Sequence, residues 1–201
     1  MLDRHIAPLI RPAIDRLAHG LVRMGVQADH VTLAAFGIGL SAAWCVTLHA
    51  YWTAAALILL SRLCDALDGA VARHTTPTDA GGFLDITLDF LFYASIPLAF
   101  AVANPAANAL AAAVLLAAFM GTGSSFLAFA ALAAKRNIQS MHYPHKSLHF
   151  LGGLAEATET LVFFVAICLW PAYFPVLAYL FAGLCCVTIV TRVYTGWRNL
   201  R

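Results

Sequence analysis

Residues 62–73 read RLCDALDGAVAR, and residues 81–89 read GGFLDITLD. Both stretches are largely apolar, yet each contains two aspartates, three or four residues apart: Asp65 with Asp68, and Asp85 with Asp89. Residues at these spacings share one face of a helix. The short connection between the stretches predicts an antiparallel helical hairpin, in which the four carboxylates meet near one end.

The composition of the whole chain places this hairpin in a membrane. Hydrophobic residues make up 62% of the 201 residues and charged residues only 11%, and the mean hydropathy is +0.80. A soluble domain needs more polar surface, whereas a membrane-spanning helix needs about 20 predominantly apolar residues. We therefore predict an all-α integral membrane protein with six transmembrane helices, at residues 31–51, 53–73, 82–103, 109–134, 149–170 and 174–196.

The basic residues predict how the chain is oriented, because cytoplasmic loops and helix ends are enriched in Lys and Arg. They precede the first predicted span, close the second, lie between the fourth and fifth, and end the chain, whereas residues 49–52, 104–108 and 171–173 contain none. We expect both termini and the aspartates on the cytoplasmic side of a bacterial inner membrane. The net charge of +2 then describes a membrane face that attracts anionic lipid, with no role in binding nucleic acid.

Residues 1–30 form a segment of their own before the predicted membrane domain at 31–201. Apolar residues recur there at three- and four-residue steps, with charged residues between them: Ile6, Leu9, Ile10, Ile14, Leu17, Leu21 and Met24. This pattern is typical of an amphipathic helix that lies in the membrane interface. The alternative, a helix that packs on the bundle, is compatible with it. We expect no cleavable signal peptide, because charges interrupt the first twenty residues.

The four aspartates need a compensating partner. An ionised carboxylate in a membrane span is costly unless it faces protein, water or metal. Carboxylate ligands suit hard cations such as magnesium, manganese or calcium, and a pair of such cations can stabilise both oxygens of a phosphoryl transfer. Two other interpretations remain: ion pairs with Arg62 and Arg73 at the end of the hairpin, or a divalent-cation transporter. The almost purely apolar outer halves of the spans disfavour the transporter.

The complete pattern is Asp65-x2-Asp68-Gly69-x2-Ala72-Arg73, followed by Gly81-x3-Asp85-x3-Asp89. It resembles the signature of the CDP-alcohol phosphatidyltransferases, and the resemblance extends to nearly the whole chain. The connection between Arg73 and Gly81 is shorter than in many members, which should not move the carboxylates.

This resemblance implies a transferase that uses two divalent cations, Mg²⁺ or Mn²⁺, held by four carboxylates: Asp65, Asp68, Asp85 and Asp89. Asp89 would also be the general base that deprotonates a small alcohol, which then attacks the lipid-linked phosphorus of a donor such as CDP-diacylglycerol and releases CMP. The donor would be bound by four further motif residues: Gly69, Ala72, Arg73 and Gly81. Members of the family are commonly homodimers, so the resemblance also implies a homodimer.

Two groups of residues bear on which alcohol is accepted. Lys135 and Lys146 lie in a basic stretch that suits a phosphorylated acceptor, such as glycerol 3-phosphate or inositol phosphate, although membrane orientation alone also predicts basic residues there. Glu156 and Glu159 lie within the fifth predicted span and suit a polyol or an amine, unless they pair internally with Arg192. Because carboxylates repel phosphate, we favour a neutral or amine-bearing alcohol.

Overall fold

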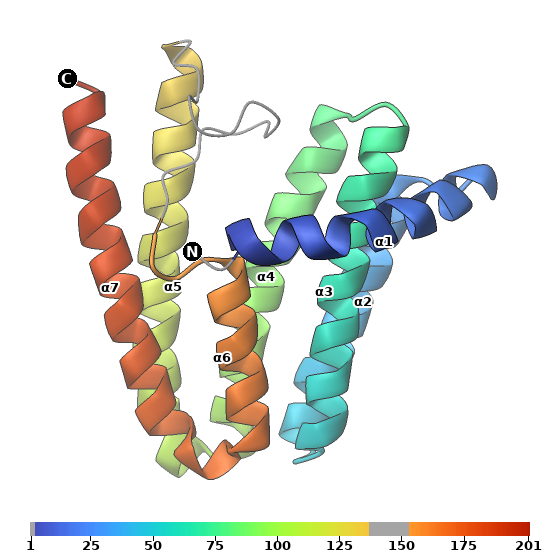
Figure 1. Cartoon of the computed structure of the whole chain (residues 1–201). Helices are drawn as coiled ribbons and strands as arrows, with labels where there is room; N and C mark the ends of the chain where they lie inside the picture. The colour runs from blue at the N-terminus through green and yellow to red at the C-terminus, as the bar shows by residue number, and fades with distance from the viewer. Residues whose placement is uncertain (1–2, 137–152) are drawn as a thin grey trace.

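The computed structural model describes residues 3–136 and 153–201, and every regular element in these residues is helical (Figure 1). The first helix, α1 (Asp3–Arg23), lies across the bundle at a steep angle to the other helices (Figure 1). The remaining elements are α2 (Ala28–Thr47), α3 (Tyr51–His74), α4 (Asp79–Ala103), α5 (Pro105–Lys135), α6 (Ala157–Leu169), the short 3-10 helix η1 (Pro171–Tyr173) and α7 (Phe174–Asn199). The all-α prediction is confirmed for this part of the chain.

Several of these helices are suited to a bilayer. Four helical stretches are long and apolar enough to cross a membrane, namely α2, α4, α5 and the stretch from η1 through α7. Large apolar side chains also point outward, such as Leu110, Leu180 and Val190, which are 70%, 64% and 67% exposed. An outer surface of this kind is suited to lipid. The chain is therefore an all-α membrane protein.

The fifth predicted span differs most from the structure. Its helix, α6, begins only at Ala157 and has 13 residues, so it is about 20 Å long at 1.5 Å per residue. A bilayer core is about 30 Å thick. Residues 153–156 are not helical, and residues 149–152 lie outside the described residues. Apolar composition alone did not distinguish this irregular segment from a helix.

The bundle core is aromatic away from the aspartates. Phe100 and Phe174 stack with ring centroids 4.6 Å apart, which joins α4 to α7. Phe163 and Phe181 stack at 4.4 Å, which joins α6 to α7. Aromatic pairs of this kind add packing energy to the burial of their area, so this end of the bundle is well fixed.

Helix α1 packs against α3 near the end of the bundle that contains the aspartates. Ile14 and Ala18 are buried in a small cluster with Ala70 and Val71. On the same helix, Leu17 stays 55% exposed. The contacts are those of the bundle-packing interpretation, and exposed apolar residues remain available for a membrane interface.

Two glycines of α2 test this packing as a matched pair. A Cβ atom at Gly39 would lie 2.5 Å from the fully buried ring of Phe92 and 3.0 Å from the Ser61 hydroxyl, whereas a Cβ at Gly37 would meet nothing within 4 Å. We expect Gly39→Ala to destabilise the protein by about 1–3 kcal/mol through overpacking. Gly37→Ala should be neutral or stabilising by up to about 1 kcal/mol, because alanine favours helix. Thermal unfolding of both variants in the same detergent is the measurement, and equal melting temperatures would contradict the packing described for α2.

Candidate functional site

The predicted hairpin is formed by α3 and α4. At the turn between them, Thr78 caps α4, and its hydroxyl accepts a hydrogen bond of 3.0 Å from the Gly81 backbone N–H. Helix α2 packs against both α3 and α4, so the aspartates lie in a three-helix environment. The sequence predicted the hairpin but not the part played by α2.

Three of the four aspartates meet at one point. Asp65, Asp68 and Asp85 each offer a carboxylate oxygen, and these oxygens all lie within 4.8 Å of one another. Asp68 is only 5% exposed, and its Oδ2 atom is buried without a hydrogen-bond partner. Unsatisfied buried oxygens and clustered carboxylates are both costly without a cation. This donor set therefore fits a hard divalent cation.

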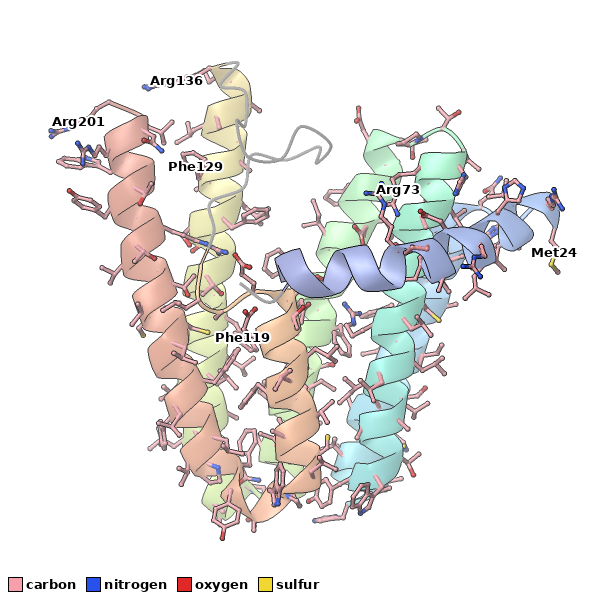
Figure 2. All side chains as sticks on the ribbon, in the orientation of Figure 1. Met24, Arg73, Phe119, Phe129, Arg136 and Arg201 are labelled. Atoms are coloured by element: carbon pink, nitrogen blue, oxygen red, sulfur yellow. The ribbon has the colours of Figure 1, made fainter. Side chains whose placement is uncertain are left out.

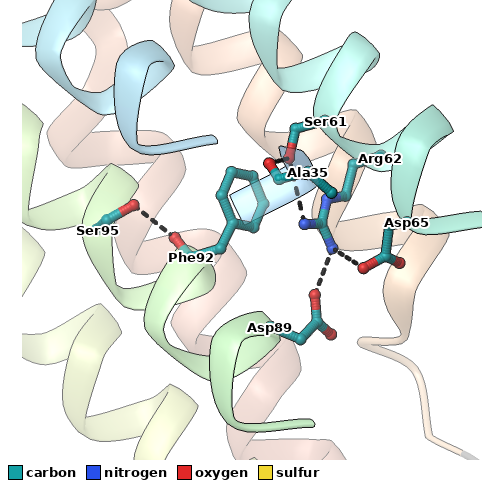
Figure 3. A network of polar contacts seen from close by, with 7 residues as sticks. All are labelled: Ala35, Ser61, Arg62, Asp65, Asp89, Phe92 and Ser95. Atoms are coloured by element: carbon teal, nitrogen blue, oxygen red, sulfur yellow. Dashed lines mark hydrogen bonds and ion pairs between the residues drawn. The ribbon is translucent and has the colours of Figure 1, made fainter. Parts of the chain in front are cut away.

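Asp89 lies apart from this group of three. Its carboxylate forms an ion pair with the Arg62 guanidinium, whose Nη1 atom is also 3.4 Å from Asp65 Oδ1 (Figure 3). The interpretation of the aspartates as ion-pair partners of Arg62 is thus correct for Asp89 and Asp65. Arg62 itself was missed as part of the site, although an arginine inside an apolar span is a signal that could have indicated it.

A small pocket opens beside these groups. Its lining comes from α2, α3 and α4: Thr32, Ala35, Phe36, Arg62, Asp65, Asp85, Leu88 and Asp89. The α2 residues among these carry no charge, so sequence patterns gave no sign of them. The pocket brings Asp89 to one shared space with Asp65 and Asp85, two of the three clustered aspartates.

The four predicted donor-binding residues lie at the loop end of the hairpin. Gly69 and Ala72 are half-buried, and a Cβ at Gly69 would make only ordinary contact, 3.6 Å from the Arg73 guanidinium. Arg73 is about half exposed and lies 3.6 Å from Asp15 of α1. A Cβ at Gly81 would lie 2.9 Å from Asp29, so this glycine permits the close approach of α2 and α4.

Two predicted acceptor residues, Glu156 and Arg192, make contacts within the chain, and Glu156 lies before α6 rather than within a helical span. Glu156 precedes α6 as its N-cap residue, and its Oε1 atom accepts a hydrogen bond of 3.0 Å from the Gly153 N–H. Arg192 of α7 is buried, donates to the Thr122 carbonyl oxygen at 3.1 Å, and interacts electrostatically with Glu156. These contacts are those of the internal-pairing alternative.

The remaining acceptor candidates are one residue of α6 and two residues of the basic stretch: Glu159, Lys135 and Lys146. Glu159 lies in the first turn of α6 and is partly buried. Lys135 is exposed in the last turn of α5, and Lys146 lies outside the described residues. The basic stretch therefore contributes two described basic side chains, Lys135 and Arg136, at the end of the bundle.

Known proteins show what this arrangement is similar to. The family model for CDP-alcohol phosphatidyltransferase matches residues 26–193. The chain is 52% identical over 201 residues to the inner membrane protein YnjF of Escherichia coli, with 100% of this chain and 98% of that protein covered. It is 28% identical over 196 residues to the archaetidylinositol phosphate synthase of Pyrococcus horikoshii, with 97% and 96% covered.

The fold is also similar to that of a solved enzyme, the phosphatidylinositol phosphate synthase PgsA1 of Mycobacterium tuberculosis. Against its structure with CDP-DAG bound, the TM-score is 0.67 at 22% identity, with 92% of this chain and 93% of that chain covered. Against its complex with manganese and citrate, the TM-score is 0.66, with 92% and 88% covered. The family model covers most of the chain and contains the whole aspartate pattern, and the chain therefore belongs to the CDP-alcohol phosphatidyltransferase family.

Proposed function

We propose that this protein transfers a phosphatidyl group from CDP-diacylglycerol, or a similar CDP-linked lipid, to the hydroxyl of a small neutral or amine-bearing alcohol. Family membership already makes it a transferase that moves such a group from a CDP-linked lipid to an alcohol. The observation that carries the proposal is the meeting of Asp65, Asp68 and Asp85 within 4.8 Å. A CDP-lipid donor agrees with the CDP-DAG bound to the mycobacterial structure.

Divalent-cation dependence follows from the family and from the fit of the aspartate group. We propose that two ions, Mg²⁺ or Mn²⁺, bind there, with Asp65, Asp68 and Asp85 as ligands and Asp89 beside the second ion. When bound, the ions offset the negative charge of the donor pyrophosphate and of the departing CMP. The buried, unpartnered Oδ2 atom of Asp68 supports this assignment, as does the manganese complex of the mycobacterial enzyme.

In the proposed reaction, Asp89 takes the proton of the acceptor hydroxyl. The acceptor oxygen forms a bond to the phosphorus attached to the lipid, the bond from that phosphorus to the oxygen of CMP breaks, and CMP leaves with the electron pair. An alcohol is a poor nucleophile until a base accepts its proton. Asp89 is suited to this task because it lines the pocket next to Asp65 and Asp85.

The donor's nucleotide end would lie along the loop end of the hairpin. Gly69 and Ala72 present little side chain there, so a flat base can approach the backbone. Arg73 supplies an exposed guanidinium for a phosphate, and Gly81 begins the wall of α4 on the opposite side. We assign these four residues to donor binding.

The proposed topology has six membrane spans in a domain at 31–201, preceded by an interfacial helix within residues 1–30. The fifth span would combine the short helix α6 with the non-helical residues before it. Figure 2 shows Arg73, Arg136 and Arg201 toward the same end of the bundle, and Arg73 lies in the last turn of α3, the helix that carries Asp65 and Asp68. Basic residues favour the cytoplasmic side, which supports a cytoplasmic active site and cytoplasmic termini. The name of the Escherichia coli relative supports an inner-membrane location. A homodimer is proposed from the family resemblance alone.

Two acceptor classes are supported by different observations. A neutral or amine-bearing alcohol is supported by Arg192, whose charge interacts with Glu156 inside the chain. A phosphorylated alcohol is supported by the names of the archaeal relative, an archaetidylinositol phosphate synthase, and of the mycobacterial enzyme, a phosphatidylinositol phosphate synthase. The first is our proposal, and the second is the alternative that the acceptor screen below decides.

The aspartate group can be tested by removing one charge. Asp68→Asn should lower metal-dependent CMP release from CDP-diacylglycerol by about 100-fold or more, because a ligand of the cation site is lost. Asp79→Asn is the matched control, since Asp79 is an exposed aspartate in the first turn of α4, and it should keep the activity of the unchanged protein. Full activity of the Asp68 variant, or CMP release that continues after divalent cations are chelated, would contradict the assignment of the aspartates as metal ligands.

The proposed base makes a separate prediction. Asp89→Asn keeps the size of the side chain but removes the proton acceptor, so kcat should fall by about 100- to 10,000-fold. Mn²⁺ should still raise the melting temperature of this variant, because Asp65, Asp68 and Asp85 remain. Steady-state kinetics and thermal unfolding with and without Mn²⁺ are the measurements. An Asp89→Asn protein with unchanged kcat would show that another group accepts the proton.

The acceptor is identified by a screen. Detergent-purified protein is incubated with Mg²⁺ or Mn²⁺, CDP-diacylglycerol and a panel of alcohols: glycerol, serine, ethanolamine, inositol, glycerol 3-phosphate and inositol phosphate. We expect lipid products, identified by mass, from the unphosphorylated members. If only phosphorylated alcohols reacted, the alternative would replace the proposal, and the Glu156–Arg192 interaction would have to open when substrate binds.

A further inference from the structure

Arg62 lies at the centre of the polar contacts between α3 and α4. Its side chain is 12% exposed, although it belongs to an apolar stretch of helix. The Nη1 atom forms an ion pair with Asp89 and lies 3.4 Å from Asp65 Oδ1 (Figure 3). One guanidinium edge thus connects a carboxylate of α3 with a carboxylate of α4.

The position of this guanidinium is fixed from its other sides. Its Nη2 atom is 3.3 Å from the Ser61 hydroxyl, which is itself buried and donates to the Ala35 carbonyl of α2 at 2.8 Å. The Cζ atom lies 4.0 Å from the centre of the Phe92 ring. An arginine held over an aromatic face and by several hydrogen bonds keeps one orientation. Arg62 is therefore held directly by contacts from α3 and α4, and α2 is connected to it through Ser61.

The glycine at position 39 makes this arrangement possible. A Cβ there would meet the Phe92 ring at 2.5 Å and the Ser61 hydroxyl at 3.0 Å. These two groups also contact the guanidinium: the ring lies against its face, and the hydroxyl accepts a hydrogen bond from Nη2. The packing of α2 is thus fitted to the residues that hold Arg62.

The positive charge of Arg62 has a further effect besides packing. An arginine stays protonated in proteins, so Arg62 offsets part of the negative charge of the four carboxylates whether or not a cation is bound. Its contacts are with Asp89 and Asp65, whereas the group that fits a cation is Asp65, Asp68 and Asp85. Arg62 therefore bridges Asp89 to one of the cation ligands, Asp65.

We propose that Arg62 is a positioning residue: it orients the Asp89 carboxylate for the acceptor hydroxyl and balances the aspartates while the cation site is empty. This inference rests on the proposed function, in which Asp89 is the base. The competing explanation is that Arg62 only packs on Phe92. The two explanations differ in what a change of charge does to cation binding and to kcat.

The test uses full-length protein in detergent and two substitutions. Arg62→Met keeps an unbranched stem over Phe92 but removes the charge, and Arg62→Lys keeps the charge but loses the planar fork. Arg198→Met, at the exposed end of α7, is the matched control for losing one positive charge. Melting temperature is measured against Mn²⁺ concentration, and kcat and KM are measured for CMP release with an acceptor from the screen.

We expect Mn²⁺ to raise the melting temperature of Arg62→Met by about 2–4 °C more than that of the unchanged protein, because uncompensated carboxylates gain more from a cation. Arg62→Lys and Arg198→Met should show the ordinary rise. The kcat of Arg62→Met should fall by about 100-fold, and that of Arg62→Lys by about 10-fold, with the acceptor KM within about twofold. A base held in the wrong orientation lowers kcat more than it weakens binding.

Equal Mn²⁺-induced rises in Arg62→Met and the unchanged protein, or an unchanged kcat in Arg62→Met, would overturn the inference. If Arg62→Met does not fold, the test relies on Arg62→Lys. An Arg62→Lys protein with the same kcat as the unchanged protein would also overturn the inference. Failure of the proposed function is recognised separately. In that case the unchanged protein releases no CMP or Asp89→Asn keeps full activity, whereas the Mn²⁺ comparison of the Arg62 variants still reports on charge balance.

Discussion

Four carboxylates on two neighbouring apolar helices repel one another, and one of them, Asp68, is almost fully buried. Buried charges of one sign are tolerated only where opposite charge or a cation offsets them. In this protein, Arg62 forms an ion pair with Asp89 and approaches Asp65, and carboxylate oxygens of Asp65, Asp68 and Asp85 lie within 4.8 Å of one another. The negative charge of the aspartates is thus offset in part by Arg62, which is always present, and in part by a site that fits an exchangeable cation.

The placement of Arg62 between the aspartates depends on α2, a helix that carries none of the four aspartates. Helix α2 contacts both members of the hairpin and presents small residues to them, so that Phe92 and Ser61 can approach Gly39 closely. A larger residue at that point would displace the groups that support Arg62. The electrostatic arrangement therefore rests on the close packing of α2, and the site is a property of three helices rather than of a hairpin.

The sequence predicted what depends on local periodicity. The spacing of Asp65, Asp68 and Asp85 was sufficient to place their side chains on facing helices, and composition was sufficient for a membrane protein. Sequence offered an ion pair with Arg62 only as an alternative and did not indicate which aspartates it would contact, because the contact with Asp89 joins segments 27 positions apart through packing that leaves no local pattern. The irregular segment before α6 was missed for a related reason. Its residues are apolar enough to continue a span, and the hydrogen bond from Gly153 to Glu156 becomes evident only in three dimensions.

In our proposal, the CDP-linked donor and the alcohol acceptor are bound by different parts of the chain. The aspartate pattern lies on α3 and α4, whereas the Glu156–Arg192 interaction joins the segment before α6 to α7. Opposite charges that interact within the chain present a weaker field to a ligand than either charge alone. In our proposal, acceptor choice in this region therefore depends more on hydrogen bonding and shape than on net charge. A neutral polyol or a zwitterion can use both members of such a pair, whereas a phosphate must first compete with Glu156 for the arginine.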